Sequence, residues 1–150
     1  MSQNEFLATL EQPRIVDAIG EAEMKTSGEI RVHIQPKARG EIRTVAERTF
    51  ERLGMTKTAL RNGVLLFIAC DERRFVILGD RGIDEKVPPG FWDDIAANLT
   101  NRFQRGEFTD GIVEAIHSAG AQLRHYFPRG ENDVNELSDE VHVDEGTDRE

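Results

Sequence analysis

The sequence predicts a three-layer α/β/α sandwich, in which helices cover both faces of a small mixed β-sheet. Residues 62–84 contain two apolar runs, 64–70 and 75–78, separated by a short polar break, which is typical of an antiparallel hairpin. The first run is uninterrupted, as expected for a strand that is buried on both faces. A buried helix segment would also be apolar, but the preceding Asn62-Gly63 turn and the β-branched and aromatic residues favour a strand.

Further elements follow from the spacing of apolar residues. Residues 29–35 alternate between apolar and polar side chains and predict a strand with one apolar face. The link from this strand to the hairpin carries a helical stripe over residues 42–53, which suits a right-handed parallel crossover. Residues 4–25 also have helical spacing, and Pro13 either kinks one helix or begins a second at about Gln12, which we favour. Two more helices are expected over 91–103 and 112–127.

Charge divides the chain into two parts. Of the net charge of −9, residues 130–150 carry nine acidic side chains and one arginine, or −8. Residues 1–129 carry nineteen acidic side chains against eighteen Lys and Arg, or −1. We therefore expect one α/β domain over residues 1–129 and an acidic, largely mobile tail over 130–150. Four apolar tail residues could anchor part of it to the domain: Val134, Leu137, Val141 and Val143.

Composition also argues against several classes of protein. No stretch approaches the ~20 apolar residues of a membrane span, and the N-terminal residues lack the pattern of a signal peptide, so we expect a cytoplasmic, soluble monomer. No basic face dominates, and the acidic tail would repel phosphates, so nucleic acid is not an expected partner. The single cysteine, Cys70, excludes an intramolecular disulfide and ends a buried strand, which favours a packing role over a nucleophilic one.

Strand directions predict one polar cluster at an end of the sheet. If the first two strands are parallel and the third antiparallel, the segments 28–29, 62–63 and 79–82 meet there. Their carboxylate, amide and carbonyl oxygens are ligands that Ca²⁺ and Mg²⁺ prefer. The predicted metal ligands are Asp80, Asp84, Glu85, Glu29 and Asn62, with Asp71, in the hairpin turn at the opposite end, as a further candidate. The alternative is that these Asp- and Gly-rich segments form only turns, since no EF-hand pattern accompanies them.

An ordered set of short motifs resembles the TPM domain family over about residues 5–127. The motifs are Ile15-x-x-Ala18-Ile19-x-x-Ala22-Glu23, Thr26-Ser27-Gly28-Glu29-Ile30, Asn62-Gly63-Val64-Leu65, Asp71-x-Arg73, Gly79-x-x-Gly82-Ile83 and Phe103-x-x-Gly106-x-Phe108-x-x-Gly111. The chain is especially similar to short, stand-alone bacterial members that end in an acidic tail. The resemblance implies an α/β/α sandwich and a cleft lined by acidic residues. This sequence departs from the family at two places. It has Gly79-Asp80-Arg81-Gly82 where members usually have Gly-Tyr-Gly, and Phe91-Trp92-Asp93-Asp94 where they have Leu-Thr-Asp.

The resemblance also implies two classes of function. Some members of the family are described as metal-binding proteins or acid phosphatases, and others act in assembling or repairing membrane complexes. We expect a domain that binds a divalent cation in an acidic cleft and serves as a binding or assembly module for a protein partner. The alternative is a weak metal-dependent acid phosphatase, in which the ion polarises a phosphoryl oxygen and Arg81 or Arg73 balances charge.

Overall fold

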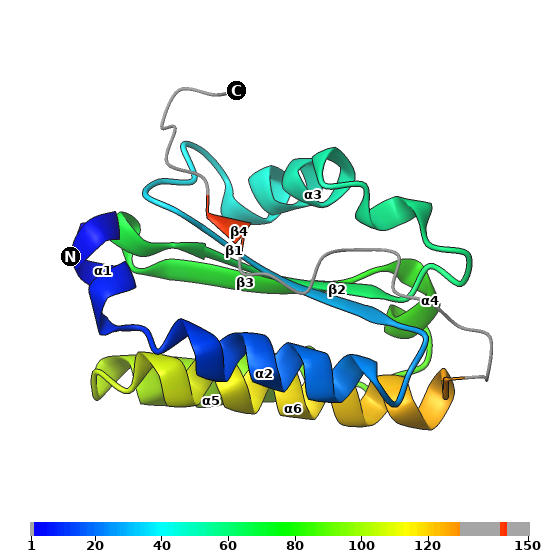
Figure 1. The fold of residues 1–150 in the computed structure, drawn as a ribbon. Helices are drawn as coiled ribbons and strands as arrows, with labels where there is room; N and C mark the ends of the chain where they lie inside the picture. The colour runs from blue at the N-terminus through cyan, green and yellow to red at the C-terminus, as the bar shows by residue number, and fades with distance from the viewer. Residues whose placement is uncertain (1, 130–141, 144–150) are drawn as a thin grey trace.

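A computed structural model of the chain describes residues 2–129 and 142–143 and has three layers (Figure 1). The strands have the spatial order β3-β2-β1-β4 in one sheet. The strands are β1 (Glu29–Gln35), β2 (Gly63–Ala69), β3 (Arg74–Gly79) and β4 (His142–Val143). The helices are α1 (Gln3–Thr9), α2 (Gln12–Glu23), α3 (Ile42–Arg52), α4 (Arg81–Asp84), α5 (Phe91–Gln104) and α6 (Phe108–Tyr126), with short 3-10 turns at Met55–Lys57 and Cys70–Glu72.

The sandwich predicted from the sequence is confirmed. Figure 1 shows α3 on one face of the sheet and α2, α5 and α6 on the other, with α1 near the turn of the hairpin. Strand β1 pairs in parallel with β2, and β2 pairs antiparallel with β3. Helix α2 begins at Gln12, with Pro13 in its first turn, so the choice of two helices over one kinked helix is also confirmed.

Strand β2 is buried along its whole length, and its two faces lie in two separate cores. Val64, Leu66 and Ile68 point into the larger core, which α2, α5 and α6 complete. Leu65 and Phe67 point into a smaller core under α3. The unbroken apolar run in the sequence therefore reflects a strand that needs a helical layer on each side.

Strand β1 differs from the expectation of one apolar and one polar, exposed face. All seven of its residues are buried, including the side chains predicted to face outward. His33 is fully buried, stacks on Phe67 with 5.3 Å between ring centroids, and its Nε2 lies 2.7 Å from Gln35 Oε1. Alternation revealed the two faces of β1 correctly but did not reveal that its polar face is buried and that His33 and Gln35 contact each other there.

Two further elements were not predicted from the sequence. Residues 80–84, for which no helix was predicted, contain the short helix α4. The sheet also has a fourth strand, β4, which pairs in parallel with β1 at His33 and Ile34. The remaining residues of the expected mobile tail, including the proposed anchors Val134, Leu137 and Val141, lie outside the described residues. None of the described helices is long and apolar enough to cross a membrane.

The close packing of α2 against α6 depends on a glycine. A Cβ atom added at Gly120 would lie 2.8 Å from the Cβ of Ala22, which is closer than the packing of real side chains allows. Ala121, the next residue of α6, is exposed. Gly120 and Ala121 are therefore a matched pair of positions in α6, of which only Gly120 packs closely against another helix.

We predict that Gly120→Leu lowers the free energy of unfolding by about 2 kcal/mol or more, because α2 and α6 must separate to admit the side chain. The matched control, Ala121→Leu, should change it by no more than about 0.5 kcal/mol. Urea unfolding followed by circular dichroism measures both values. Equal effects of the two substitutions would show that the close approach of the helices does not limit stability.

Candidate functional site

Three chain segments meet at one end of the sheet, as the strand directions predicted. Glu29 of β1 pairs with Gly63 of β2, and Val64 pairs with Gly79 of β3. The backbone N–H of Asp80 donates to the carbonyl oxygen of Gly63 at 2.8 Å. The acidic residues that follow β3 are thereby fixed to the start of β2.

Asp80 is a buried carboxylate at this end, and both of its oxygens accept hydrogen bonds. Its side chain is 6% exposed and accepts two hydrogen bonds from Arg61, at 2.6 Å from Nε and 2.8 Å from Nη2. Its Oδ1 also accepts from the backbone N–H of Arg81, so that Asp80 is the N-cap of α4. The Asp80 carboxylate raises the pKa of the Arg61 guanidinium above its ordinary value through these hydrogen bonds. A cation at Asp80 would have to compete with a bidentate ion pair that already balances its charge.

A glycine brings α4 against the segment that holds Arg61. The backbone N–H of Gly82 donates to the Arg61 carbonyl oxygen at 2.7 Å. A Cβ at Gly82 would lie 2.1 Å from the carbonyl oxygen of Leu60, a backbone atom that cannot move aside easily. The Gly79-x-x-Gly82 spacing thus serves a close backbone approach, which places Asp80 within reach of Arg61.

The other predicted ligands do not converge on Asp80. Asn62 is buried and donates from Nδ2 to Ser27 Oγ at 3.2 Å, and Glu29 is 1% exposed at the start of β1. Glu85 is an exposed residue just past α4. Asp71 lies in the hairpin turn at the opposite end of β2, so the structure does not bring it to this cluster. Within the described residues, no three acidic, histidine or cysteine side chains form a group that could hold a metal ion.

Asp84 instead lines a recess together with Asp93, which was not among the ligands predicted from the sequence. A recess of about 230 Å³ between α4 and the start of α5 is lined by Asp84, Asp93 and the loop 87–92. One oxygen of Asp84, Oδ1, accepts from the indole N–H of Trp92 at 2.9 Å. No described residue donates a hydrogen bond to the Asp93 carboxylate, so the recess presents carboxylate oxygens with free acceptor positions. Asp93 could have been found from its place in the first turn of the helix that follows the Asp84 loop.

Cys70 lies at the other end of β2 and takes no part in this cluster. The thiol is buried, and its Sγ lies 3.6 Å from the carbonyl oxygen of Gln35 in donor geometry. Burial, and secondarily the charge of the neighbouring Asp71, raises the pKa of the Cys70 thiol above its ordinary value. The thiolate, which is the nucleophilic form, is therefore disfavoured at neutral pH.

We predict that Arg61→Asn destabilises the fold by about 2 kcal/mol, because it leaves the Asp80 carboxylate buried without its charged donor. Asparagine is chosen because Arg61 has a positive φ of 53°, which asparagine tolerates. The control Arg81→Asn, at an exposed position, should change stability by no more than about 0.5 kcal/mol. In an Asp80→Asn background the cost of Arg61→Asn should shrink, and an unchanged cost in thermal unfolding would contradict the pairing.

We predict that Cys70 reacts with iodoacetamide at pH 8 at least about tenfold more slowly in the folded chain than in urea. The reason is that burial both blocks access to the sulfur and reduces the thiolate fraction. Mass spectrometry of the alkylated protein over time measures the two rates. Similar rates in the two conditions would mean that the thiol is accessible and would reopen a nucleophilic role.

Comparison with known proteins agrees with this architecture. No curated protein matches the sequence significantly. Among solved structures, the chain is similar to the BA42 protein of the psychrophilic bacterium Bizionia argentinensis, determined by NMR. The two share 40% sequence identity and superpose with a TM-score of 0.83, over 89% of this chain and 92% of BA42. The profile of the TPM domain matches residues 1–122, and the chain therefore belongs to the TPM domain family.

Proposed function

We propose that the chain is a binding module that takes up a divalent cation, Ca²⁺ or Mg²⁺, at the acidic end of its sheet. The observation that carries this proposal is the recess in which the carboxylates of Asp84 and Asp93 flank the loop 87–92. Hard cations take carboxylate and main-chain carbonyl oxygens as ligands, and a short irregular loop supplies both. The ion would join α4 to α5 and so order the loop between them.

The ligand set predicts weak binding. Asp84 offers the oxygen that Trp92 leaves open, and Asp93 offers both of its oxygens. The partial positive charge at the start of α5 opposes a cation nearby. With two carboxylates and this opposing field, we expect a dissociation constant on the order of 10⁻⁴ to 10⁻³ M, at the weak end of protein calcium sites.

The other ligands predicted from the sequence do not bind the ion directly in this proposal. Asp80 stays with Arg61, and Glu29 and Asn62 stay within the buried end of the sheet. Glu85, which is exposed beside the recess, adds negative charge without lining it. Asp80 would hold α4 in position through its pairing with Arg61, and the direct ligands would be Asp84 and Asp93.

The recess supports binding better than it supports phosphatase chemistry. Among the described residues that line it there is no hydroxyl, thiol or imidazole that could serve as a nucleophile or base. Of the two arginines considered for charge balance, Arg81 is close, but Arg73 lies at the opposite end of β2. A metal-bound water would be held only loosely by two carboxylates and a loop.

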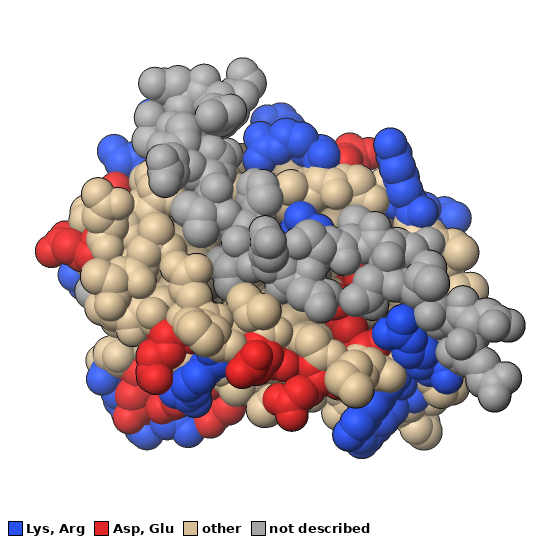
Figure 2. Space-filling view, viewed as in Figure 1, with Lys and Arg blue, Asp and Glu red and all other residues tan. Residues whose placement is uncertain are grey.

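A protein partner completes the proposal. Residues 130–150, with a net charge of −8, would dock on a basic surface of the partner, while the cation orders the loop at the sheet end. On the face drawn in Figure 2, acidic and basic side chains are interspersed over the helical layer and do not form one basic patch. The cytoplasmic location and the monomeric state remain predictions.

We predict that saturating Ca²⁺ or Mg²⁺ raises the unfolding temperature of the chelator-treated protein by about 5–10 °C, because an ion at one hundred times its dissociation constant adds roughly 2.7 kcal/mol. The rise should disappear in Asp84→Asn/Asp93→Asn, in which asparagine keeps the acceptor for Trp92. The matched control is Glu85→Gln/Asp94→Asn, which removes the same charge from two exposed neighbours outside the recess and should retain the rise.

Two results would contradict the proposal. The first is no thermal shift at about 100 mM ion, which is at least one hundred times the expected dissociation constant. The second is an equal loss of the shift in both double variants, which would indicate a diffuse charge effect. Ion-dependent hydrolysis of p-nitrophenyl phosphate that is lost in Asp84→Asn/Asp93→Asn would instead favour the phosphatase.

A further inference from the structure

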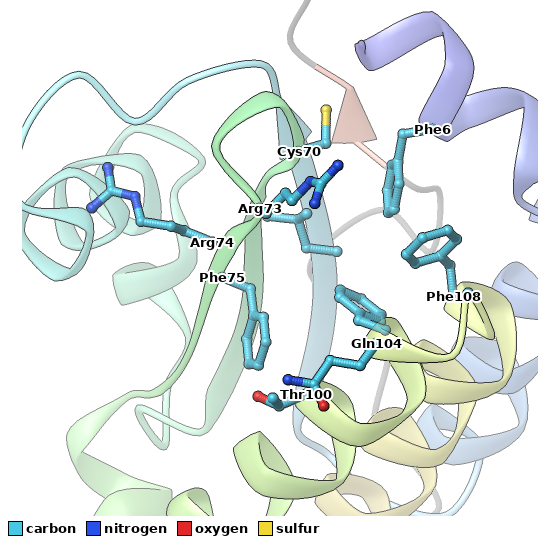
Figure 3. A pocket seen from close by; sticks show the side chains of 11 residues that line it. Phe6, Cys70, Arg73, Arg74, Phe75, Thr100, Gln104 and Phe108 are labelled. Atoms are coloured by element: carbon cyan, nitrogen blue, oxygen red, sulfur yellow. The ribbon is translucent and has the colours of Figure 1, made fainter. Parts of the chain in front are cut away.

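A second cavity lies at the other end of the sheet, away from the acidic recess. Its volume is about 580 Å³, within the range of about 300–1,000 Å³ typical of small-molecule sites. It is bounded by α1, the end of β2, the hairpin turn and the segment that joins α5 to α6 (Figure 3). The proposed cation site uses none of these residues, although Arg73, Phe103, Gly106 and Phe108 belong to the motifs that carry the family resemblance.

Four phenyl rings from four parts of the chain form the apolar wall of this cavity, which we call the phenylalanine cavity. Phe103 lies at the centre, with ring centroids 5.6 Å from Phe75, 5.2 Å from Phe108 and 6.3 Å from Phe6, each in an edge-to-face arrangement. Phe6 also meets Phe108 edge to face at 5.1 Å. These contacts fix the rings relative to one another, so that the wall is largely preformed.

The wall leaves aromatic surface uncovered. Phe6 is buried, but Phe75, Phe103 and Phe108 remain partly exposed and face the cavity. The uncovered surface favours an apolar ligand body, because each Å² of apolar surface removed from water contributes about 25 cal/mol. A ring or acyl chain placed there would contact the faces and edges of three aromatic side chains.

One cationic group stands at the rim of this apolar wall. Arg73 is exposed, and Figure 3 shows its guanidinium between the hairpin turn and Phe6. No described residue forms a hydrogen bond or ion pair with the Arg73 side chain, whereas the neighbouring Arg74 is held by Glu72 at 2.7 Å. No acidic residue is among the described residues that line the cavity. The rim therefore carries a positive charge that the described domain leaves unbalanced.

The backbone at Arg73 is a second, independent observation. Arg73 has φ 54° and ψ 42°, the left-handed conformation that glycine or asparagine adopts more readily. A bulky residue in this conformation is uncommon, and such positions concentrate at ligand sites. Here the left-handed turn at the end of Cys70–Glu72 directs the side chain towards the cavity and not along the strand.

We propose that the phenylalanine cavity binds a small organic anion with an apolar body, of the class of aryl or acyl carboxylates. The carboxylate would accept two parallel hydrogen bonds from the Arg73 guanidinium, and the apolar body would lie on Phe75, Phe103 and Phe108. Thr100 and Gln104, one helical turn apart on α5, line the same cavity and offer neutral polar contacts to a substituent on the body. An inorganic anion would leave the rings uncovered, and a neutral hydrocarbon would leave the guanidinium without a partner.

The test uses the full chain and 2-naphthoate as the probe, with binding followed through backbone amide shifts in two-dimensional NMR. Saturable shifts are expected at Arg73, Phe75, Thr100 and Gly106, and none at Asp84. Arg73→Asn, which suits the left-handed conformation, should weaken binding by about tenfold or more, the size of a lost charged hydrogen bond. The matched control is Arg39→Asn, an exposed arginine with φ 61° outside the cavity, which should leave the affinity unchanged.

A second variant tests the cavity itself. Thr100→Trp, at an exposed helical position, would fill the space beside Phe103 and should abolish binding while the unfolding temperature stays close to that of the original chain. The neutral analogue 2-naphthalenemethanol should bind about tenfold more weakly than 2-naphthoate. The proposal is overturned by absence of saturation at millimolar probe, by equal affinity for the neutral analogue, or by unchanged affinity in both Arg73→Asn and Thr100→Trp.

Discussion

The burial of β2 on both faces is the constraint on which the rest of the fold depends. A strand with no polar face cannot lie at the surface, so helices must cover both of its sides. The parallel partner β1 and the antiparallel partner β3 then determine which chain ends meet at each end of the sheet. Both candidate binding sites are consequences of this arrangement, because they lie where strands end and the helical layers stop.

The two ends of β2 differ in charge and in the chemistry they can support. At the start of the strand, acidic side chains follow β3 and one of them, Asp80, is already neutralised by Arg61. At its other end, a cavity wall of phenyl rings is combined with an arginine that no described residue pairs. The proposed cation would bind at the first end and the proposed anion at the second, so the two ligands would not compete.

Much of this fold could be predicted from the sequence, because its signals are local. The apolar run 64–70 and the helical stripes depend on residues close together in the chain, and the structure places strands and helices there. The missed features depend on distant partners. The buried His33 of β1 contacts Phe67 and Gln35, and helix α4 depends on the contact of Gly82 with Leu60 and Arg61, more than twenty positions earlier. Strand β4, two residues long, has no periodicity to detect.

The site was predicted in outline but not in detail, for a similar reason. Strand directions correctly gathered Glu29, Asn62 and Asp80 at one end of the sheet. Sequence spacing could not show that Arg61 already holds Asp80, or that Asp84 lines a recess with Asp93. Whether a carboxylate is free depends on the side chains around it, and those come from loops whose conformations no periodic pattern records.

The two cores on either side of the sheet are unequal, and this has a dynamic consequence. Twenty-one described buried residues make up the core beneath α2, α5 and α6, but only eight make up the core beneath α3. Because local opening follows the least buried apolar surface, α3 should detach from the sheet in a subglobal fluctuation while the larger core stays closed. Amide protons of α3 would then exchange before those of α6. During such an opening, the sheet face that carries Leu65 and Phe67 would be transiently exposed to solvent.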